Sequence, residues 1–273
     1  MLYRFIPTPS SSSLGLGTVT IHYYALCILL GIAAAILIGK VRYVRAGGIG
    51  NEIYDLAIYV VPAGIVGGRL YHVITTPELY FGPHGHFLNI FKIWQGGMGI
   101  WGAVAFGVAT GSLYFKIKPC SVSFLIALDA IAPGIVLAQG IGRWGNWFNG
   151  ELFGKPTTLP WALTIPLSER PTGFESFATF QPTFLYESIW CVLIALLIIY
   201  MPGIRKLKEG NEFLLYVFLY SSGRLWIESL RIDSAHHIFG LRLNIWIAGI
   251  CAIGSAAGLY ARQKRVASGP ADQ

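Results

Sequence analysis

The sequence predicts an all-α polytopic membrane protein with seven transmembrane helices. Charged residues make up 12% of the 273-residue chain and hydrophobic residues 54%, whereas about 25% of the residues of a soluble protein are charged. Apolar runs of about 20 residues, the length that crosses the hydrocarbon layer of a bilayer, recur along the whole chain. The basic residues gather in alternate connections between these runs, as in a membrane protein with a fixed orientation.

The predicted spans follow one another with mostly short connections. The third run is rich in glycine, and the second and sixth contain arginine, so hydropathy supports these three least. The chain length favours a single integral-membrane domain over residues 1–273. The seven runs lie near 19–39, 53–74, 97–115, 122–142, 184–201, 212–230 and 243–261.

Two segments outside the spans are assigned from their composition. The 155–183 segment is rich in Pro, Thr and Phe and too polar to span; we predict a small extracytoplasmic head, the alternative being a plain connector. Residues 262–273 are predicted to form a cytoplasmic tail. The first span is preceded by a polar lead and followed by its positive charges, which favours an uncleaved span with the N-terminus outside.

The basic clusters define the predicted orientation. With the N-terminus outside and the C-terminus in the cytoplasm, all four clusters face the cytoplasm, as the positive-inside rule requires. The net charge of +7 is explained by this distribution, so no nucleic-acid partner is predicted. The clusters are Lys40/Arg42/Arg45, Lys116/Lys118, Arg205/Lys206/Lys208 and Arg262/Lys264/Arg265.

This topology gathers the unusual polar residues in one layer near the outer face. Arg224 lies roughly 18 Å from the inner edge of its span, at 1.5 Å per residue, and so in the outer half of the membrane. Asp129 lies nearer the inner side and is interpreted as a residue of packing or stability, and Glu187 as buried structural polarity. Besides Arg224 and Glu187, the layer contains Tyr23, Tyr24, Arg69, His72, Gly96, Gly97, Trp101, Arg143, Tyr186 and Asn244.

The stretch Gly142–Gly154, GRWGNWFNGELFG, has the composition of a lipid-headgroup site. Glycine lets the backbone approach a ligand closely, and an arginine fork fits the paired oxygens of a phosphate. The aromatic residues suit the boundary between hydrocarbon and water. The alternative is a tight interfacial turn whose glycines serve helix packing.

The sixth span carries Tyr220, Arg224 and Glu228 at spacings of four, and hence on one helix face. An arginine at the centre of a span costs about 2.5 kcal/mol or more, so it needs a partner or a function. Arg224 and Glu228 could form a structural ion pair. We favour a clamp in which Arg143 and Arg224 hold a phosphodiester; Arg69 is a third member or only reaches toward the headgroups.

Glu151, beside Asn146 and Asn149, could accept a proton as a general base or only neutralise Arg143. The histidines and the four cysteines show no metal-ligand spacing, and His72 alone is kept as a minor site candidate. No metal and no cofactor are therefore predicted.

Several stretches together resemble one family. Gly142–Gly154 resembles the signature of the prolipoprotein diacylglyceryl transferases, and five more stretches follow in the family's order and spacing, covering nearly the whole chain. These are Tyr23–Tyr24, GGRLYHV (Gly67–Val73), WQGGM (Trp94–Met98), QPTFLYE (Gln181–Glu187) and YSSGRLWIE (Tyr220–Glu228).

The resemblance implies a seven-span enzyme of the bacterial inner membrane whose active site faces the outer leaflet. Such an enzyme moves the diacylglyceryl group of phosphatidylglycerol onto the lipobox cysteine of a preprolipoprotein signal peptide. The products are a thioether and glycerol 1-phosphate. No cofactor is implied, and the partners are the lipid and the signal peptide.

The resemblance also implies functional positions. Arg143 and Arg224 match essential arginines, and the catalytic set is completed by Glu151 and Tyr24. Two positions depart from the pattern, because Trp101 and Gln181 stand where many members have histidine; histidine is therefore not the base at either position. The phosphatidylglycerol-binding set is Arg143, Arg224, Asn146, Gly154, Glu228, Tyr220, Arg69 and Gly97.

The mechanistic hypothesis places both arginines on the phosphate, where they stabilise the leaving group. The cysteine thiolate attacks the glycerol carbon that bears the phosphate ester, and Glu151 or Tyr24 accepts the thiol proton. The alternative function is a lipid or solute transporter with an anion site at the outer leaflet. Transporters often show inverted repeats and a midplane site, which this sequence does not.

Overall fold

The computed structural model describes residues 5–17, 19–83, 85–204, 207–233, 235 and 237–267. Arg205, Lys206 and residues 268–273, which belong to a predicted basic cluster and to the predicted tail, lie outside this set. Each predicted span corresponds to one helix. The helices are α1 Tyr23–Arg45, α2 Gly50–Thr75, α3 Ile100–Ile117, α4 Phe124–Phe148, α5 Thr183–Tyr200, α6 Asn211–Leu230 and α7 Leu243–Ala267.

Among the described residues, six helices are long and apolar enough to cross a membrane; α6, which carries Arg224 and Glu228, is not one of them. This mostly helical architecture is that of a polytopic membrane protein. The chain divides into two compact units, residues 1–39 with 128–273 (unit 1) and residues 40–127 (unit 2).

Short strands accompany the helices and were not predicted. They form a three-stranded sheet in the order β1-β4-β5, with β1 parallel to β4, and two antiparallel hairpins, β2–β3 and β6–β7. The first span was predicted from residue 19, but Val19–His22, of which the first three residues are β-branched, pair with Ser13–Leu16 instead, so that helix begins at Tyr23. The strands are β1 Ile6–Pro7, β2 Ser13–Leu16, β3 Val19–His22, β4 Leu163–Thr164, β5 Thr179–Phe180, β6 His237–Ile238 and β7 Leu241–Arg242.

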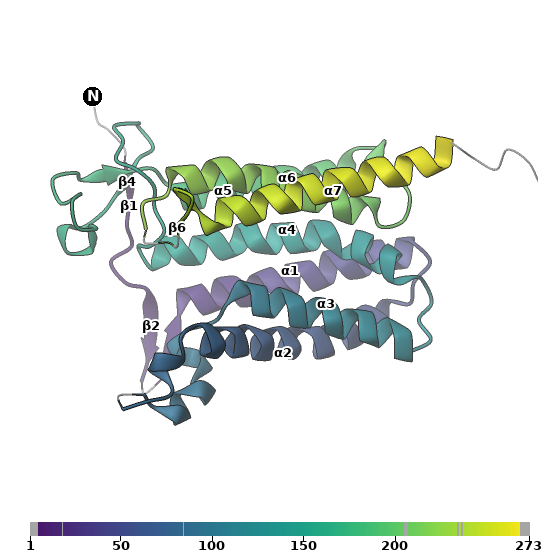
Figure 1. The fold of residues 1–273 in the computed structure, drawn as a ribbon, viewed down its shortest axis with the longest axis horizontal. Coiled ribbons are helices and arrows are strands. Elements are labelled where there is room, and N and C mark those ends of the chain that lie inside the picture. The colour runs from purple at the N-terminus through teal and green to yellow at the C-terminus, as the bar shows by residue number, and fades with distance from the viewer. Residues whose placement is uncertain are drawn as a thin grey trace, which may run out of the picture. The chain divides into compact units, whose positions relative to one another are not determined.

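Small residues let the helices of unit 1 pack closely. A Cβ at Gly134 of α4 would lie 2.8 Å from the backbone of Ala35 in α1, so only glycine permits this approach. Helix α6 packs against α5 and α7. Figure 1 shows α4, α5, α6 and α7 running side by side. Their buried core includes Ala132, Val136, Cys191, Ile194, Ala195, Ile198 and Tyr216.

The start of α6 is held by Asp129 of α4. The Asp129 carboxylate accepts hydrogen bonds from the backbone N–H groups of Gly210, at 2.6 Å, and Phe213, at 2.8 Å. A helix start leaves its first N–H groups without intrahelical acceptors, so this carboxylate caps α6. The sequence-based interpretation gave Asp129 a role in packing or stability, and these contacts favour stability.

The head of unit 1 is built from two distant parts of the chain. Strand β1 pairs with β4 in the 155–183 segment, and the Thr8 hydroxyl donates to the Thr164 carbonyl at 2.5 Å. The Trp147 indole at the end of α4 donates to the Pro7 carbonyl at 3.0 Å. The head therefore sits at the end of the helices where α4 finishes and α5 begins. Its apolar centre contains Phe153, Leu163, Ile165, Phe180 and Phe184.

Unit 2 is a pair of closely packed helices. A Cβ at Gly67 of α2 would lie 2.5 Å from the Gly102 carbonyl oxygen of α3, so glycine is required at this contact. The connection between α2 and α3 contains three short 3₁₀ turns. These are Pro77–Leu79, Phe87–Phe91 and Ile93–Gln95.

Candidate functional site

A buried carboxylate, Glu187, lies at the centre of the polar cluster of unit 1. Its Oε1 is 2.9 Å from Nη2 of Arg143, and its Oε2 is 2.7 Å from Nη1 of Arg224. The Tyr220 hydroxyl also donates to Oε1, at 2.8 Å. Burying a carboxylate is costly unless it is paired and hydrogen-bonded. Glu187 meets this condition by bringing two arginines from different helices onto one acceptor.

Arg143 is also tied to the glycine-rich signature. Its Nη1 donates to Oδ1 of Asn146, three residues on, at 3.1 Å. The Asn146 and Asn149 amides donate in turn to Oε1 of Glu151, at 2.9 and 3.1 Å. This chain exists because α4 continues to Phe148, six residues beyond the predicted end of the span, and places Arg143 and Asn146 on one face.

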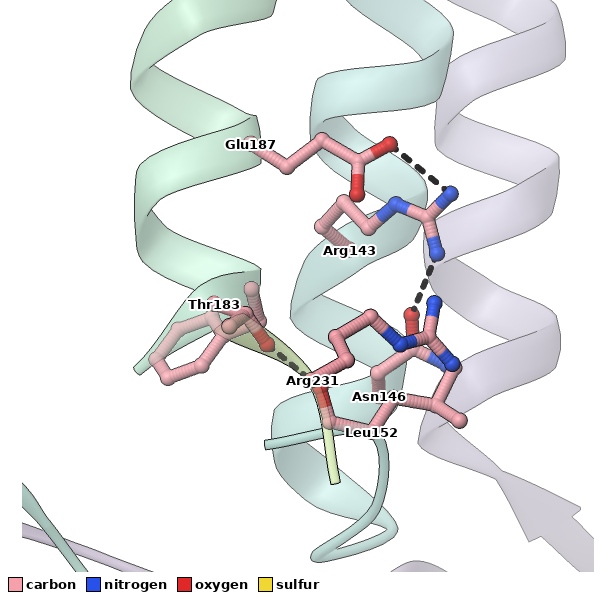
Figure 2. Close-up of a pocket in the computed structure, with 7 residues that line it drawn as sticks. Arg143, Asn146, Leu152, Thr183, Glu187 and Arg231 are labelled. Carbon is pink, nitrogen blue, oxygen red and sulfur yellow. Dashed lines mark hydrogen bonds and ion pairs between the residues drawn. The ribbon is translucent and has the colours of Figure 1, made fainter. Parts of the chain in front are cut away.

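A small cavity, partly open to solvent, lies beside this cluster. Figure 2 shows Arg143 between Glu187 and Asn146, with the Arg231 guanidinium on the same cavity wall. Leu152 adopts a φ of 60°, unusual for a residue other than glycine, and its carbonyl accepts a hydrogen bond from the Thr183 hydroxyl. The lining residues are Arg143, Asn146, Leu152, Thr183, Phe184, Glu187 and Arg231.

A second buried carboxylate, Glu228, lies on the far side of Arg224. Glu228 is completely inaccessible to solvent and pairs with Nη2 of Arg224. Its Oε1 accepts from Nε of Arg242 at 2.8 Å and from the Asn244 amide at 3.1 Å. Arg224 is therefore held between two carboxylates, one on α5 and one on its own helix.

Asp233, in the connection between α6 and α7, completes the network. It accepts from Nε and Nη2 of Arg231 at 2.7 and 2.9 Å, and from Nη2 of Arg242 at 2.9 Å. Burial alone would raise the pKa of Asp233, but the hydrogen bonds and charges of Arg231 and Arg242 outweigh it and lower that pKa. The carboxylate is thus kept ionised between two cations.

The described ion pairs of this network join four guanidinium groups to three carboxylates, an excess of one positive charge among the paired groups. Glu151, exposed and joined to Arg143 through Asn146, is a further carboxylate nearby. A positive site with low-dielectric walls favours an anionic ligand. Within the part of the chain that the structure describes, no group of three His, Cys, Asp or Glu side chains could hold a metal ion.

Comparison with known proteins shows which family of proteins this positively charged site belongs to. The model of the prolipoprotein diacylglyceryl transferase family matches residues 12–261. The chain belongs to this family. The resemblance drawn from the sequence is thereby confirmed.

Relatives match nearly the whole chain. The phosphatidylglycerol–prolipoprotein diacylglyceryl transferase of Streptomyces griseus is 51% identical over 248 residues, which are 91% of this chain and 74% of that protein. The enzyme of the same name from Cutibacterium acnes is 48% identical, over 97% of this chain and 88% of its own length. That of Bifidobacterium adolescentis is 44% identical, over 96% and 82%.

Two residues that the diacylglyceryl transferase resemblance marked lie at the edge of the site. The Tyr24 ring covers Gly145, where a Cβ would lie 2.4 Å from the ring, and its side chain is partly exposed. Gly154 is buried, and its N–H donates to the Gln181 carbonyl at 2.9 Å. A Cβ at Gly154 would meet Gln181, Thr183 and Leu230 at 3.0–3.1 Å. Close packing therefore accounts for this glycine without a bound lipid.

Arg69 and Gly97 belong to unit 2, where they meet each other. The Arg69 guanidinium donates to the carbonyls of Gly96, Gly97 and Ile90 at 2.6–2.8 Å, and also to that of Asn89. Gly97 has a φ of 72° and leaves no room for a Cβ beside Arg69. These contacts favour a structural role for Arg69 in shaping the α2–α3 connection, and lipid binding at either residue stays a prediction.

The sequence of this diacylglyceryl transferase did not predict four residues of the network as site residues. They are Glu187, Arg231, Asp233 and Arg242. Glu187 was interpreted as structural polarity, although the structure places it between both predicted clamp arginines. Arg231, Asp233 and Arg242 lie in a short connection that the predicted topology puts outside. Two arginines in a short outer connection run against the positive-inside tendency, and that signal could have identified them.

Proposed function

We propose that the cavity and the arginine network of unit 1 form the active site at which this enzyme transfers a diacylglyceryl group to a lipobox cysteine. Family membership makes the chain a transferase of lipoprotein biosynthesis. The curated relatives are named for phosphatidylglycerol and prolipoprotein, and we assign these two substrates to this chain. The observation that carries the assignment is the convergence of Arg143 and Arg224 on Glu187 beside a cavity, in a network whose paired groups carry an excess of positive charge.

In this proposal Arg143 and Arg224 act on the phosphate of phosphatidylglycerol. Arg143 faces the cavity with about a quarter of its side chain accessible, so it can donate directly to a phosphate oxygen. Arg224 does not line the cavity but pairs with the other oxygen of Glu187. Its positive charge therefore attracts the phosphate at short range without direct contact. Guanidinium groups fixed in advance by carboxylates stabilise charge on the leaving phosphate without reorganising during the reaction.

The transfer step is a substitution at the glycerol carbon that bears the phosphate ester. The lipobox sulfur forms a C–S bond as the C–O bond to phosphate breaks, and glycerol 1-phosphate leaves with the electron pair. The thiol proton passes to the Glu151 carboxylate; Tyr24 could accept it only as a phenolate. Glu151 suits this role because the described hydrogen bonds occupy only its Oε1, and its side chain is exposed. The positive site favours the thiolate, because neighbouring cations lower a thiol pKa.

We infer that α6 is the seventh span and that the site lies at the outer leaflet of the bacterial inner membrane. Helix α6 packs between α5 and α7, and its charged groups Arg224 and Glu228 are paired inside the protein, so low hydropathy does not prevent it from spanning. The distribution of lysine and arginine supports an outside N-terminus and a cytoplasmic C-terminus.

The test is release of glycerol 1-phosphate by purified protein in phosphatidylglycerol vesicles with a lipobox peptide. Wild-type protein is expected to release it with the cysteine peptide and not with its Cys→Ser variant. Arg143→Ala should lower the rate at least a hundredfold, about 2.7 kcal/mol, because it removes the cavity-facing cation. Arg170→Ala, in the head, is the control, since Arg170 donates to the backbone carbonyls of Ile165 and Glu175.

Two results would contradict the proposal. Release that ignores the peptide cysteine would indicate a lipase-like reaction. Full transfer activity in Arg143→Ala would remove the arginine clamp from the mechanism.

A further inference from the structure

We infer that Arg231 is a third cation of the phosphate site and contacts the phospholipid headgroup directly. This inference rests on the proposed function, because it names a further binding residue for the same substrate. It goes beyond the pair Arg143 and Arg224 that the sequence singled out.

Arg231 lies at the wall of the cavity. It directly follows α6, and its guanidinium lines the cavity together with Arg143 and Asn146, as Figure 2 shows. Arg224 is not among the residues that line this cavity. The two cations that a ligand in the cavity would meet first are therefore Arg143 and Arg231.

The hydrogen bonds of the Arg231 guanidinium leave one of its nitrogens available. Nε and Nη2 donate to the two oxygens of Asp233. Nη1 lies 3.7 Å from Oε2 of Glu228, which is longer than a hydrogen bond. The nitrogen that remains available is thus held in a fixed position, and a phosphate oxygen could accept from it.

Arg242 provides the contrast within the same network. Its Nε donates to Glu228 at 2.8 Å, its Nη1 to the Asp233 carbonyl at 2.7 Å, and its Nη2 to the Asp233 carboxylate at 2.9 Å. Every nitrogen of Arg242 has a protein acceptor, so we assign it a structural role. Arg242 alone supplies a positive charge that balances the negative charge of Asp233. Arg231 is therefore not needed only to balance that charge.

The backbone around Arg231 is fixed as well. The Lys155 N–H donates to the Leu230 carbonyl at 2.8 Å, and Gly154 forms a β-bridge with Arg231. The end of α6 is therefore attached to the end of the glycine-rich signature. An arginine placed this way loses little conformational freedom when it binds a phosphate, which favours affinity.

The experiment compares wild type with Arg231→Gln, Arg231→Lys and the double variant Arg231→Gln/Asp233→Asn, with Arg170→Gln as the matched control. Equilibrium binding of glycerol 1-phosphate is measured by isothermal titration calorimetry, and the KM for phosphatidylglycerol is measured with a saturating lipobox peptide. The calorimetry gives a readout that does not depend on turnover.

We expect Arg231→Gln to weaken glycerol 1-phosphate binding at least tenfold and to raise KM, and Arg231→Lys to lose less because it keeps the charge. The double variant should remain as weak as Arg231→Gln, and Arg170→Gln should match wild type. If removing Asp233 together with Arg231 restored wild-type affinity and KM, Arg231 would be only an ion-pair partner, and the inference would fail.

Other outcomes are equally decisive. Wild-type affinity in Arg231→Gln would overturn the inference, as would a wild type that binds no glycerol 1-phosphate. If neither glutamine variant folds, as judged by gel filtration, unchanged affinity and KM in Arg231→Lys would overturn it, and a measurable loss in both would support it. Failure of the proposed function is seen separately, as wild-type protein that releases no glycerol phosphate in response to the peptide cysteine.

Discussion

At the scale of single residues, the arrangement of charge depends on carboxylates that hold arginines in place. Glu187 binds Arg143 and Arg224, and Glu228 binds Arg224 and Arg242. A buried ion pair gains little net stability over apolar packing, but removing one partner leaves an uncompensated charge. These carboxylates therefore serve to fix the positions of cations more than to stabilise the fold.

Glu187→Gln tests this view. The substitution removes the negative charge between Arg143 and Arg224, so the two guanidinium groups should separate. We expect kcat/KM for diacylglyceryl transfer to fall about a hundredfold, equivalent to about 2.7 kcal/mol. Glu175→Gln is the control, because the carboxylate of that exposed head glutamate accepts a hydrogen bond from the nearby Gly173 N–H and has no described ion pair. An unchanged kcat/KM in Glu187→Gln would show that the arginines need no carboxylate to hold them.

At the scale of elements, the site depends on where helices begin and end. Helix α4 runs on through Arg143 and Asn146, whereas α6 ends just before Arg231. The start of α6 is set at the other end of the helix by Asp129, through the N–H groups of Gly210 and Phe213. The cap and the proposed catalytic residue Arg224 therefore lie at different places along α6, and we expect that they can be changed independently.

Asp129→Ala should lower stability without changing substrate binding. Loss of two backbone hydrogen bonds at a helix start costs about 1–2 kcal/mol, which lowers the apparent Tm of a protein of this size by roughly 2–8 °C. Thermal unfolding in detergent measures the shift, and KM for phosphatidylglycerol should stay at the wild-type value. Asp55→Ala, at an exposed position on α2, is the matched control. An unaltered Tm in Asp129→Ala would argue against the cap.

At the scale of the whole molecule, the distribution of charge along the chain predicts how it sits in the membrane. The basic clusters alternate with the segments that hold the head and the arginine network. The positive-inside rule then places the head and the proposed site together on the outer side. This arrangement suits a reaction between an outer-leaflet lipid and a cysteine that has already crossed the membrane.

Cysteine labelling in intact cells tests this orientation. In a background with the four native cysteines replaced by serine, Ser168→Cys in the head should react with a membrane-impermeant maleimide. Lys208→Cys, before α6, should react only after the membrane is permeabilised. Both positions are exposed, so accessibility within the protein is matched. If Lys208→Cys alone were labelled in intact cells, the protein would have the opposite orientation to the one predicted.

The sequence by itself determined the family and the approximate positions of the helices, and it predicted most of the proposed site chemistry. Runs of apolar residues at membrane length predicted each helix, because in lipid every backbone polar group must be satisfied within the segment. Arg143, Arg224 and Glu228 were recognised because charge inside an apolar run is costly and so requires a function or a partner. The family followed from long motifs in a fixed order.

Only the tertiary structure decided which charges meet. Glu187 of α5 pairs with Arg143 of α4 and with Arg224 of α6, and sequence spacing carries no information about contacts between such distant segments. The pairing of β1 with β4 of the head could not be predicted either, because a two-residue strand has no periodic pattern. Periodicity reports which face of a helix is apolar, whereas packing alone sets which polar groups those faces bring together.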